Sequence, residues 1–227
     1  MSNESDSLIE PRRDYSADTL RRAQLDTDPL AQFRRWLQEA RDAKLIDATA
    51  MMLATVDAGA RPHSRVVLLK RCDEHGFVWY TYQDSDKGRQ LAANPVAALL
   101  FYWSKLERQV RIEGRVELLE PAEADEYFHS RPEGSRFSAA ASQQSGHVAD
   151  RGVLEARVAE LHERHPDGAV PRPSIWGGYR LMPDRYEFWQ GRDDRLHDRF
   201  EFARAGAGRH PPGDEQGDGW HINRMQP

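Results

Sequence analysis

The feature that most constrains this chain is a series of strand-like segments joined by turns too short to hold a crossover helix. Segments rich in apolar and β-branched residues cover 51–56, 63–71 and 77–82, and Gly-containing turns separate them. Two more such segments follow at 96–103 and 108–119. Strands on tight turns pair antiparallel, because parallel pairing needs a long crossover. The sequence therefore predicts a mostly β protein with flanking helices, built as a barrel or a sandwich.

Helical patterns interrupt and flank these strands. Asp28 and Pro29 are typical of an N-cap and a first helical position, and apolar residues then recur at helical spacing. Ser85 can cap a short helix that Pro95 ends. The stretch Ala205–Gly219, rich in Gly and Pro, predicts an exposed hairpin loop. Further helices are predicted at 121–129, 138–145 and 152–164, and further strands at 176–181, 185–190, 195–203 and 220–224.

The length of 227 residues fits one domain, and no linker divides two cores. Residues 1–16 lack periodicity and are predicted to be a flexible segment, whereas 17–227 form the single domain. No strand-to-helix turn carries a Gly-x-Gly-x-x-Gly or Gly-x-x-x-x-Gly-Lys-Ser pattern. Rossmann and P-loop nucleotide sites are therefore excluded.

Charge and hydropathy narrow the partners. Thirty-two Lys and Arg against 37 Asp and Glu give a net charge of −5, which argues against nucleic acid. The longest apolar run, 96–103, is far shorter than the roughly 20 residues of a membrane span, and the N-terminus has no apolar signal region. The single cysteine and scattered histidines indicate neither a disulfide nor a metal site. We expect a cytoplasmic protein without a membrane partner.

Two sites for anions are suggested near the first strands. Arg65 and Lys70 bracket an apolar segment, and in a regular strand they point to opposite faces unless a bulge intervenes. Plain strand termini would look the same. Farther on, Tyr80 and Thr81 run into a helix start at Ser85, with Lys87 in the first turn. Such a helix start can hold a phosphate, although caps of this kind are common.

A third candidate is the alternation of Arg195, His197 and Arg199, which predicts two cations and a histidine on one strand face. Surface charge could give the same alternation. Against that, the flanking Trp189 and Phe200 favour a partly enclosed setting that suits a flat, anionic, heteroaromatic ligand.

Tyr127, Arg131 and Ser135 form a fourth candidate at i, i+4 and i+8. Pro132 disfavours helical geometry at Arg131, so we expect the trio to wrap a helix end and the following turn. Two hydroxyls and a guanidinium converging there would suit one phosphate group, and the alternative is a capped helix end with an exposed arginine.

Several motifs together resemble the pyridoxamine 5′-phosphate oxidase family. The similarity runs from about Arg12 to the C-terminus, with the motifs in the family's order. The motifs are Arg65–Lys70 with four apolar residues between the cations, Leu106-Glu107-Arg108-Gln109-Val110, Tyr127-Phe128-His129-Ser130-Arg131-Pro132, Trp176-Gly177-Gly178, Glu187-Phe188-Trp189-Gln190-Gly191 and Arg195-Leu196-His197-Asp198-Arg199.

This resemblance implies an FMN-binding split β-barrel that works as a homodimer with FMN at the subunit interface. It implies an enzyme of vitamin B6 metabolism that oxidises pyridoxamine 5′-phosphate and pyridoxine 5′-phosphate to pyridoxal 5′-phosphate. In that reaction the flavin accepts the C4′ hydride, and O2 reoxidises it to give hydrogen peroxide, with ammonia released from the amine. No metal is implied.

The resemblance also assigns residues. Arg195 and His197, the expected catalytic residues, would hold the pyridine ring against the flavin, and Arg12 to Tyr15 would close over the pocket. The substrate phosphate would meet Lys70, Tyr127, Arg131 and Ser135. The FMN contacts would be Arg65, Val66, Val67, Leu68, Leu69, Lys70, Tyr80, Thr81, Lys87, Gln109, Gln144, Ser145, Trp189 and Arg199.

One departure from the family is Asp86, where a basic residue is usual. A carboxylate there weakens flavin binding unless it faces away. Two other functions stay open: another split-barrel flavoprotein, such as a flavin reductase, and a non-catalytic carrier of FMN or pyridoxal phosphate. The sequence leaves open the preference between amine and alcohol substrates and any second site for the product.

Overall fold

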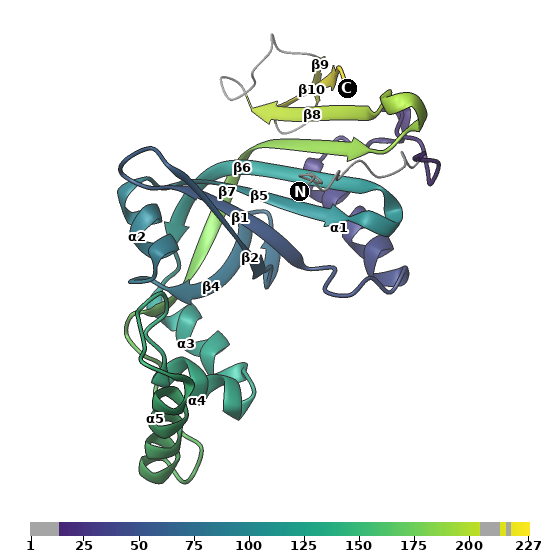
Figure 1. The fold of residues 1–227 in the computed structure, drawn as a ribbon. Coiled ribbons are helices and arrows are strands. Elements are labelled where there is room, and N and C mark those ends of the chain that lie inside the picture. The colour runs from purple at the N-terminus through teal and green to yellow at the C-terminus, as the bar shows by residue number, and fades with distance from the viewer. Residues whose placement is uncertain (1–13, 205–213, 217–218) are drawn as a thin grey trace, which may run out of the picture.

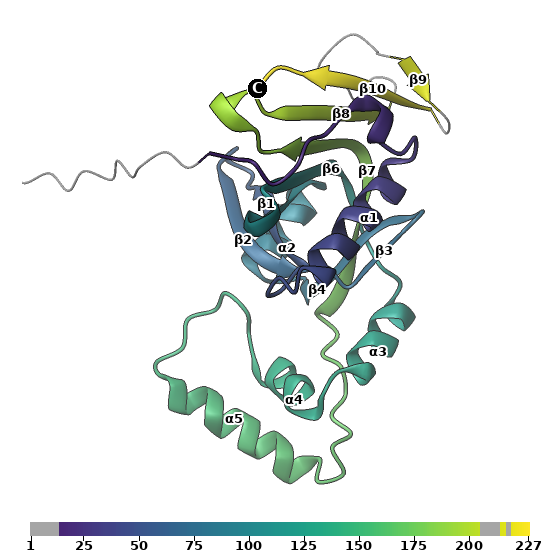
Figure 2. The ribbon, with the colours of Figure 1, turned by 90° about the vertical axis from the view of Figure 1, so that its right-hand side faces the viewer.

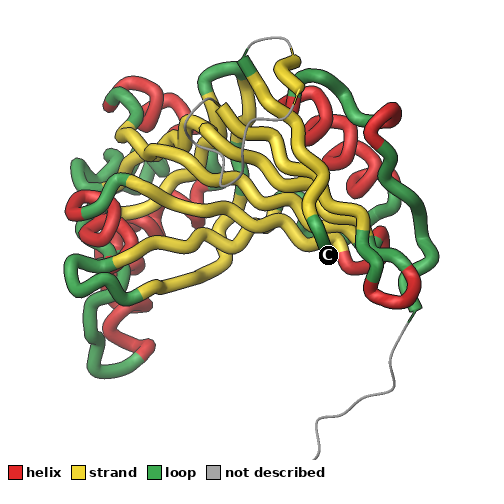
Figure 3. Tube along the Cα trace, turned by 90° about the horizontal axis from the view of Figure 1, so that it is seen from above, coloured by secondary structure: helices red, strands yellow, loops and turns green. Residues whose placement is uncertain are grey.

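The chain folds around a strongly curved antiparallel sheet, seen in a computed structural model that describes residues 14–204, 214–216 and 219–227 (Figures 1 and 3). The predicted class, mostly β with flanking helices, is confirmed. The sheet order is β2-β1-β5-β6-β7-β8-β10-β9, with β4 joining β3 and β7. The strands are β1 (Ala50–Val56), β2 (Pro62–Leu68), β3 (Arg71–Asp73), β4 (Gly76–Tyr82), β5 (Val96–Trp103), β6 (Arg108–Leu118), β7 (Trp176–Gln190), β8 (Asp198–Arg204), β9 (Asp214–Gln216) and β10 (Trp220–Met225).

Strand β7 splits the sheet into its two parts. Its first half pairs with β4 and its second half with β8, while β6 runs along its other edge. The sequence predicted two strands here, 176–181 and 185–190. They form one continuous strand instead. The pairing of this strand with β6 shifts register at Glu113/Gly114, and this shift keeps the strand paired across the segment between the two predicted strands. Strand β7 therefore belongs to both parts of the split barrel.

The barrel closes at a break between β2 and β3. The N–H of Leu69 donates to the carbonyl of Thr49 beside β1 at 2.9 Å, and the N–H of Lys70 donates to the carbonyl of Val78 on β4 at 2.9 Å. The chain thus changes partner strand within two residues. The single strand predicted over 63–71 is wrong for this reason.

Local capping signals set the helix starts. The Asp28 side chain accepts hydrogen bonds from the N–H groups of Leu30 and Ala31, and Ser85 caps the next helix, as predicted. The fourth helix begins five residues before the predicted Ser138. The helices are α1 (Pro29–Asp42), α2 (Asp86–Ala93), α3 (Pro121–Ser130), α4 (Glu133–Ala141) and α5 (Arg151–Arg164).

Two apolar clusters hold these parts together. The main core lies inside the barrel under α1, with Phe33, Phe77 and Phe188 fully buried. A smaller cluster around Phe128, Phe137 and Trp176 attaches the α3–α5 arm, which extends from one end of the barrel (Figures 1 and 2). Every helix in the described ranges is too short or too polar to cross a bilayer.

Candidate functional site

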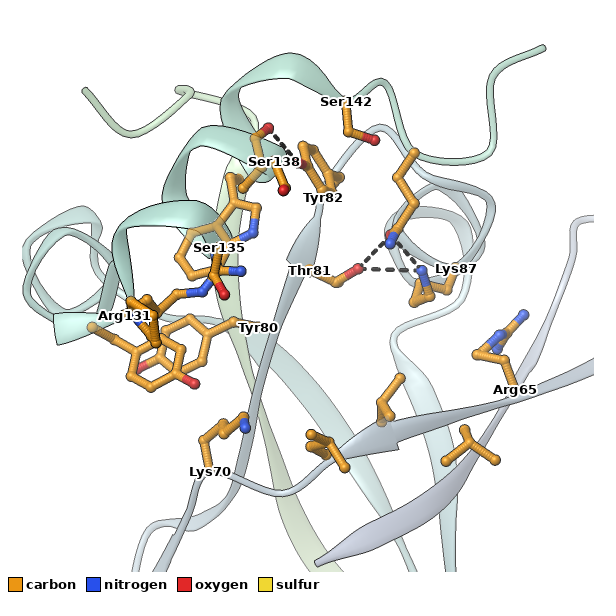
Figure 4. Close-up of a pocket in the computed structure, with 18 of the residues that line it drawn as sticks. Arg65, Lys70, Tyr80, Thr81, Tyr82, Lys87, Arg131, Ser135, Ser138 and Ser142 are labelled. Carbon is orange, nitrogen blue, oxygen red and sulfur yellow. Dashed lines mark hydrogen bonds between the residues drawn. The ribbon is translucent and has the colours of Figure 1, made fainter. Parts of the chain in front are cut away.

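A cavity of about 870 Å³ opens where the barrel meets the α3–α5 arm. Its wall is formed by β2, β4, the start of α2 and the α3–α4 corner (Figure 4). Twelve of the residues expected to contact FMN or substrate line it. They are Arg65, Val66, Val67, Leu68, Lys70, Tyr80, Thr81, Lys87, Tyr127, Arg131, Ser135 and Gln144.

The cations of the cavity lie at two separate ends. Lys70 and Arg131 lie on one side, and Arg65 and Lys87 lie on the other, with Thr81 between the two pairs (Figure 4). Arg65 and Lys70 share this cavity, although a regular strand would point them apart. The break after Leu68 is the physical reason, since it restarts the alternation of side chains.

Lys87 defines the first end. Its side chain is buried, and Nζ donates to Gln144 Oε1 at 2.6 Å, to Thr81 Oγ1 at 3.2 Å and to Ser85 Oγ at 3.4 Å. Burial, with the nearby Arg65 guanidinium, lowers the pKa of Lys87 to about 8. The three hydrogen-bond acceptors are all neutral, so this buried ammonium is suited to an anionic ligand.

Arg65 is held at the same end by groups of the barrel. Its Nη1 donates to Thr55 Oγ1 at 2.6 Å and its Nη2 donates to Gln90 Oε1 at 3.0 Å. Asp86, the residue that departs from the family pattern, is exposed and pairs with Arg89 at 2.5 Å. The Asp86 carboxylate therefore has its own cation outside the cavity.

The second end is built from the corner between α3 and α4. Arg131 follows the last residue of α3 in an extended conformation, as Pro132 predicted, whereas Ser135, expected in the following turn, lies in the first turn of α4. The Arg131 guanidinium lies 5.0 Å over the Trp176 ring, and its buried Nη1 has no hydrogen-bond partner among the described residues. A buried guanidinium N–H without an acceptor suits an anion in this cavity.

An aromatic stack supports that end. Tyr127 lies on Tyr80 with ring centroids 3.9 Å apart, and Tyr80 lies on Trp176 at 5.4 Å. Gly178 permits this stack, because a Cβ there would lie 2.9 Å from Tyr80 Cε1. Trp176 also lines the cavity and was not predicted from the sequence, although its Trp-Gly-Gly motif was a usable signal. Tyr82, Ser138 and Ser142 line it as well, and no sequence signal pointed to them.

The remaining candidate residues form a second group outside this cavity. Tyr15 packs edge-on against Trp189 and His197 at 5.9 and 5.5 Å, and Trp189 and His197 are 4.6 Å apart. Gln109, Trp189 and Arg199 are direct neighbours across β6, β7 and β8.

One prediction for this group is wrong. Arg195 does not alternate with His197 and Arg199 on a strand, because β8 begins only at Asp198. Arg195 instead ends a 3₁₀ turn in which it and Asp194 have φ values of 65° and 53°. Phe200 faces the core and is no flank of the site.

His197 and Arg199 have defined partners. The N–H of Arg192 donates to His197 Nδ1 at 3.1 Å, so the neutral ring carries its proton on Nε2. Burial, with Arg195 and Arg199 nearby, lowers the pKa of His197. Arg199 donates from Nε to Glu187 Oε1 at 2.9 Å, and its Nη2 forms an ion pair with the same oxygen at 2.7 Å.

Three expected contacts remain. The Leu69 side chain is buried in the core and does not line the cavity. Ser145 follows the lining residue Gln144, and the Ser145 Oγ accepts a hydrogen bond from the N–H of Asp86 at 3.2 Å. Arg12 lies outside the described residues. Within the described ranges, no cluster of three potential metal ligands occurs.

A split barrel whose cavity carries cations at two ends defines a class of protein built to hold small anionic ligands. The comparisons with known proteins specify this class further. Residues 37–165 match the family described as pyridoxamine 5′-phosphate oxidase, and residues 176–227 match the pyridoxine 5′-phosphate oxidase C-terminal dimerisation region. The chain belongs to the pyridoxamine 5′-phosphate oxidase family of enzymes.

Relatives support this membership over almost the full length. The pyridoxine/pyridoxamine 5′-phosphate oxidase 1 of Ralstonia nicotianae is 54% identical over 221 residues, covering 97% of this chain and 99% of its own. Among solved structures, PhzG from Burkholderia lata, in complex with tetrahydrophenazine-1-carboxylic acid, is 32% identical with a TM-score of 0.82, covering 92% of this chain and 98% of its own. A pyridoxamine 5′-phosphate oxidase-related, FMN binding protein from Nostoc punctiforme shares the fold, at 16% identity and a TM-score of 0.66, covering 89% of this chain and 100% of its own.

Proposed function

We propose that this protein is an FMN-dependent oxidase that converts pyridoxamine 5′-phosphate and pyridoxine 5′-phosphate to pyridoxal 5′-phosphate, with O2 as the electron acceptor. The observation that carries this proposal is the cavity with two cationic ends, one for each of two phosphate groups. The names of relatives that match over almost their full length support pyridoxine and pyridoxamine 5′-phosphate as the substrates. Such an enzyme belongs to vitamin B6 synthesis and salvage.

The residues at the Lys87 end fit the phosphate of FMN. Lys87 and Arg65 supply positive charge, and Thr81 and Gln144 supply polar groups beside it. The buried ammonium has only neutral acceptors around it, which favours an anion there. Bound FMN would supply the acceptor for a hydride, so the protein itself needs neither a nucleophile nor a metal.

The residues at the Arg131 end fit the substrate phosphate. Lys70, Tyr127, Arg131 and Ser135 all line this part of the cavity, and Arg131 offers a buried N–H with no hydrogen-bond partner in the described part of the chain. Holding the phosphate here fixes one end of the substrate. Orientation of bound reactants can lower a barrier by about 7–11 kcal/mol.

Arg195 and His197 would orient the pyridine ring. With Nδ1 occupied by the backbone of Arg192, neutral His197 can only donate to a ligand, through Nε2. A ring hydroxyl or its anion is a matching acceptor. Arg195 would add positive charge at the reacting end of the ring, while Trp189 and Tyr15 exclude water around His197.

These two groups would meet in a homodimer. The outer face of β1, β2 and β5 exposes large apolar side chains, among them Met52 at 42% and Val66 at 66%. Val66 pairs with Met52, which pairs with Leu100, so the apolar face is continuous beside the cavity. A second copy of the chain covering this face would bring its Trp189–His197 group to the cavity, with FMN at the interface.

One assay separates the proposed activity from its alternatives. Purified protein is loaded with FMN, pyridoxine 5′-phosphate is added, and oxygen uptake and aldehyde formation are followed. We expect both signals together, with hydrogen peroxide as a product. Bound flavin without aldehyde would instead support another split-barrel flavoprotein, such as a flavin reductase. Binding of pyridoxal phosphate without oxygen uptake would support a carrier.

A further inference from the structure

The helix that supplies the substrate-phosphate end is attached to the barrel by a carboxylate outside the cavity. Glu123 lies one turn before Tyr127 on α3, so both side chains share one helix face. Glu123 Oε2 lies 2.6 Å from Arg71 Nη2 and 3.6 Å from Arg180 Nη2. The Arg71 Nε in turn binds Asp73 at 3.0 Å, which fixes the guanidinium on β3.

This contact ties α3 to both neighbours of the strand that carries Tyr80. Arg71 is on β3 and Arg180 is on β7, and both strands pair with β4. Tyr127 stacks on Tyr80 at 3.9 Å, so α3 meets the same strands through an ion pair and a ring stack. With the buried Phe128 and the Asp125–Arg172 ion pair, these two contacts help set where the Tyr127 hydroxyl and the end of α3 lie.

The wall at this point is thin. A second cavity of about 210 Å³ lies on its other side, lined by Arg71, Glu123, Glu126 and Ser130. Lys70, Tyr80 and Tyr127 line both cavities, so they are the partition between them. Because empty space backs these side chains, close packing alone does not fix their positions. The Arg71–Glu123 ion pair at the base of the partition can hold these side chains in position.

We propose that the Arg71–Glu123 ion pair is a positioning contact that sets the affinity of the cavity for the substrate phosphate. Neither residue lines the main cavity, so they act through Tyr127 and Arg131. The inference rests on the proposed function, since it assigns the α3–α4 corner to the phosphate of the substrate. FMN would bind at the Arg65–Lys87 end, so the ion pair is not expected to affect FMN binding.

The test uses the FMN-loaded protein and the variants Arg71→Met and Glu123→Gln. Losing a partly exposed ion pair predicts a KM for pyridoxine 5′-phosphate raised about two- to fivefold, with kcat unchanged. The FMN dissociation constant stays unchanged. Arg71→Lys restores most of the loss, and the double variant is no worse than the poorer single variant.

The exposed i, i+4 pair Arg151–Glu155 on α5 supplies the matched control, and Glu155→Gln leaves KM unchanged. An unchanged KM in both test variants would overturn the inference, as would parallel losses of KM, kcat and FMN affinity. The dissociation constant of pyridoxal 5′-phosphate, measured by absorbance, is expected to rise with KM. If the wild type binds this compound but oxidises nothing, the proposed activity is wrong, and the binding constants of the variants still decide the role of the ion pair.

Discussion

Lys87 carries the clearest information about the ligand at the scale of single residues. A buried ammonium costs free energy unless an opposite charge or strong acceptors compensate it. Here Thr81, Ser85 and Gln144 supply neutral acceptors only, and burial together with the nearby Arg65 lowers the pKa of Lys87. Arg131 shows the same condition at the other end, with a buried N–H lacking a partner among the described residues. Within the described part of the chain neither residue forms an ion pair with a carboxylate, so both would suit an anionic ligand.

The pKa of Lys87 predicts how FMN binding depends on pH. The free protein holds the Lys87 proton below about pH 8, and a bound phosphate raises that pKa. Affinity is therefore full near pH 7, is about halved at pH 8, and falls by up to about tenfold per pH unit above that. Fluorescence titration of FMN from pH 7 to 9.5 measures this. Lys87→Met should bind weakly with no such slope, and a wild-type affinity independent of pH would contradict the assignment.

Arg131 predicts a selective effect on the substrate. Removing its charge in Arg131→Met loses a charge-assisted hydrogen bond worth about 1.5–3 kcal/mol. The ratio kcat/KM for pyridoxine 5′-phosphate should fall about 10- to 100-fold, while the FMN dissociation constant stays within about twofold of wild type. Steady-state kinetics and flavin titration measure the two quantities. Equal losses in both would place Arg131 at the flavin instead.

At the scale of elements, local signals were predictable and nonlocal ones were not. Asp28 and Ser85 cap their helices through neighbours in sequence, so composition and spacing were enough. The break after Leu68 depends on carbonyls of Thr49 and Val78 elsewhere in the chain, and no pattern within 63–71 shows it.

In the candidate site, too, features set by neighbouring residues were predictable and those set by distant residues were not. Pro132 made the turn at Arg131 predictable, because its effect on the preceding residue is local. The left-handed turn at Asp194 and Arg195 was missed, since neither residue is a glycine and nothing nearby signals positive φ. Which cations share a cavity depends on how β2, β4 and the α3–α4 corner come together, and so only the structure could show it.

Gly88 predicts how sensitive the start of α2 is to its packing. A Cβ there would lie 2.2 Å from the carbonyl oxygen of Gln83, so Gly88→Ala must displace the helix start that carries Lys87. We expect a loss of about 1–3 kcal/mol in the free energy of unfolding, together with weaker FMN binding. Gly134→Ala in α4 is the control for stability, because a Cβ there meets nothing within 4 Å. Chemical denaturation of both variants measures the difference, and equal stabilities would contradict the expected clash.

At the scale of the whole molecule, the candidate residues divide between a cavity and a separate Trp189–His197 group. The residues that would bind the phosphates are in the first and those that would orient the ring are in the second. The exposed apolar face of β1 and β2 lies beside the cavity, and the chain matches a dimerisation region over residues 176–227. In the proposed homodimer, a second copy would bring its Trp189–His197 group to the cavity and complete one site.

Met52 tests this assembly without altering a proposed ligand contact. Met52→Glu places a charge in the apolar face, and burying it costs several kcal/mol. The dimer should dissociate at concentrations where the wild type does not, and FMN affinity should fall with it. Ile46→Glu, at a side chain 94% exposed outside that face, is the control. Sedimentation velocity with flavin absorbance follows both quantities, and a stable Met52→Glu dimer would contradict the proposed interface.

The most direct test of the central claim is a crystal structure with FMN and pyridoxal 5′-phosphate bound together. The account predicts the FMN phosphate at Lys87 and Arg65 and the phosphate of pyridoxal 5′-phosphate at Arg131 and Ser135, with the pyridine ring between the flavin and the His197 of a second copy. Both phosphates at one end, or a flavin bound away from the cavity, would contradict it.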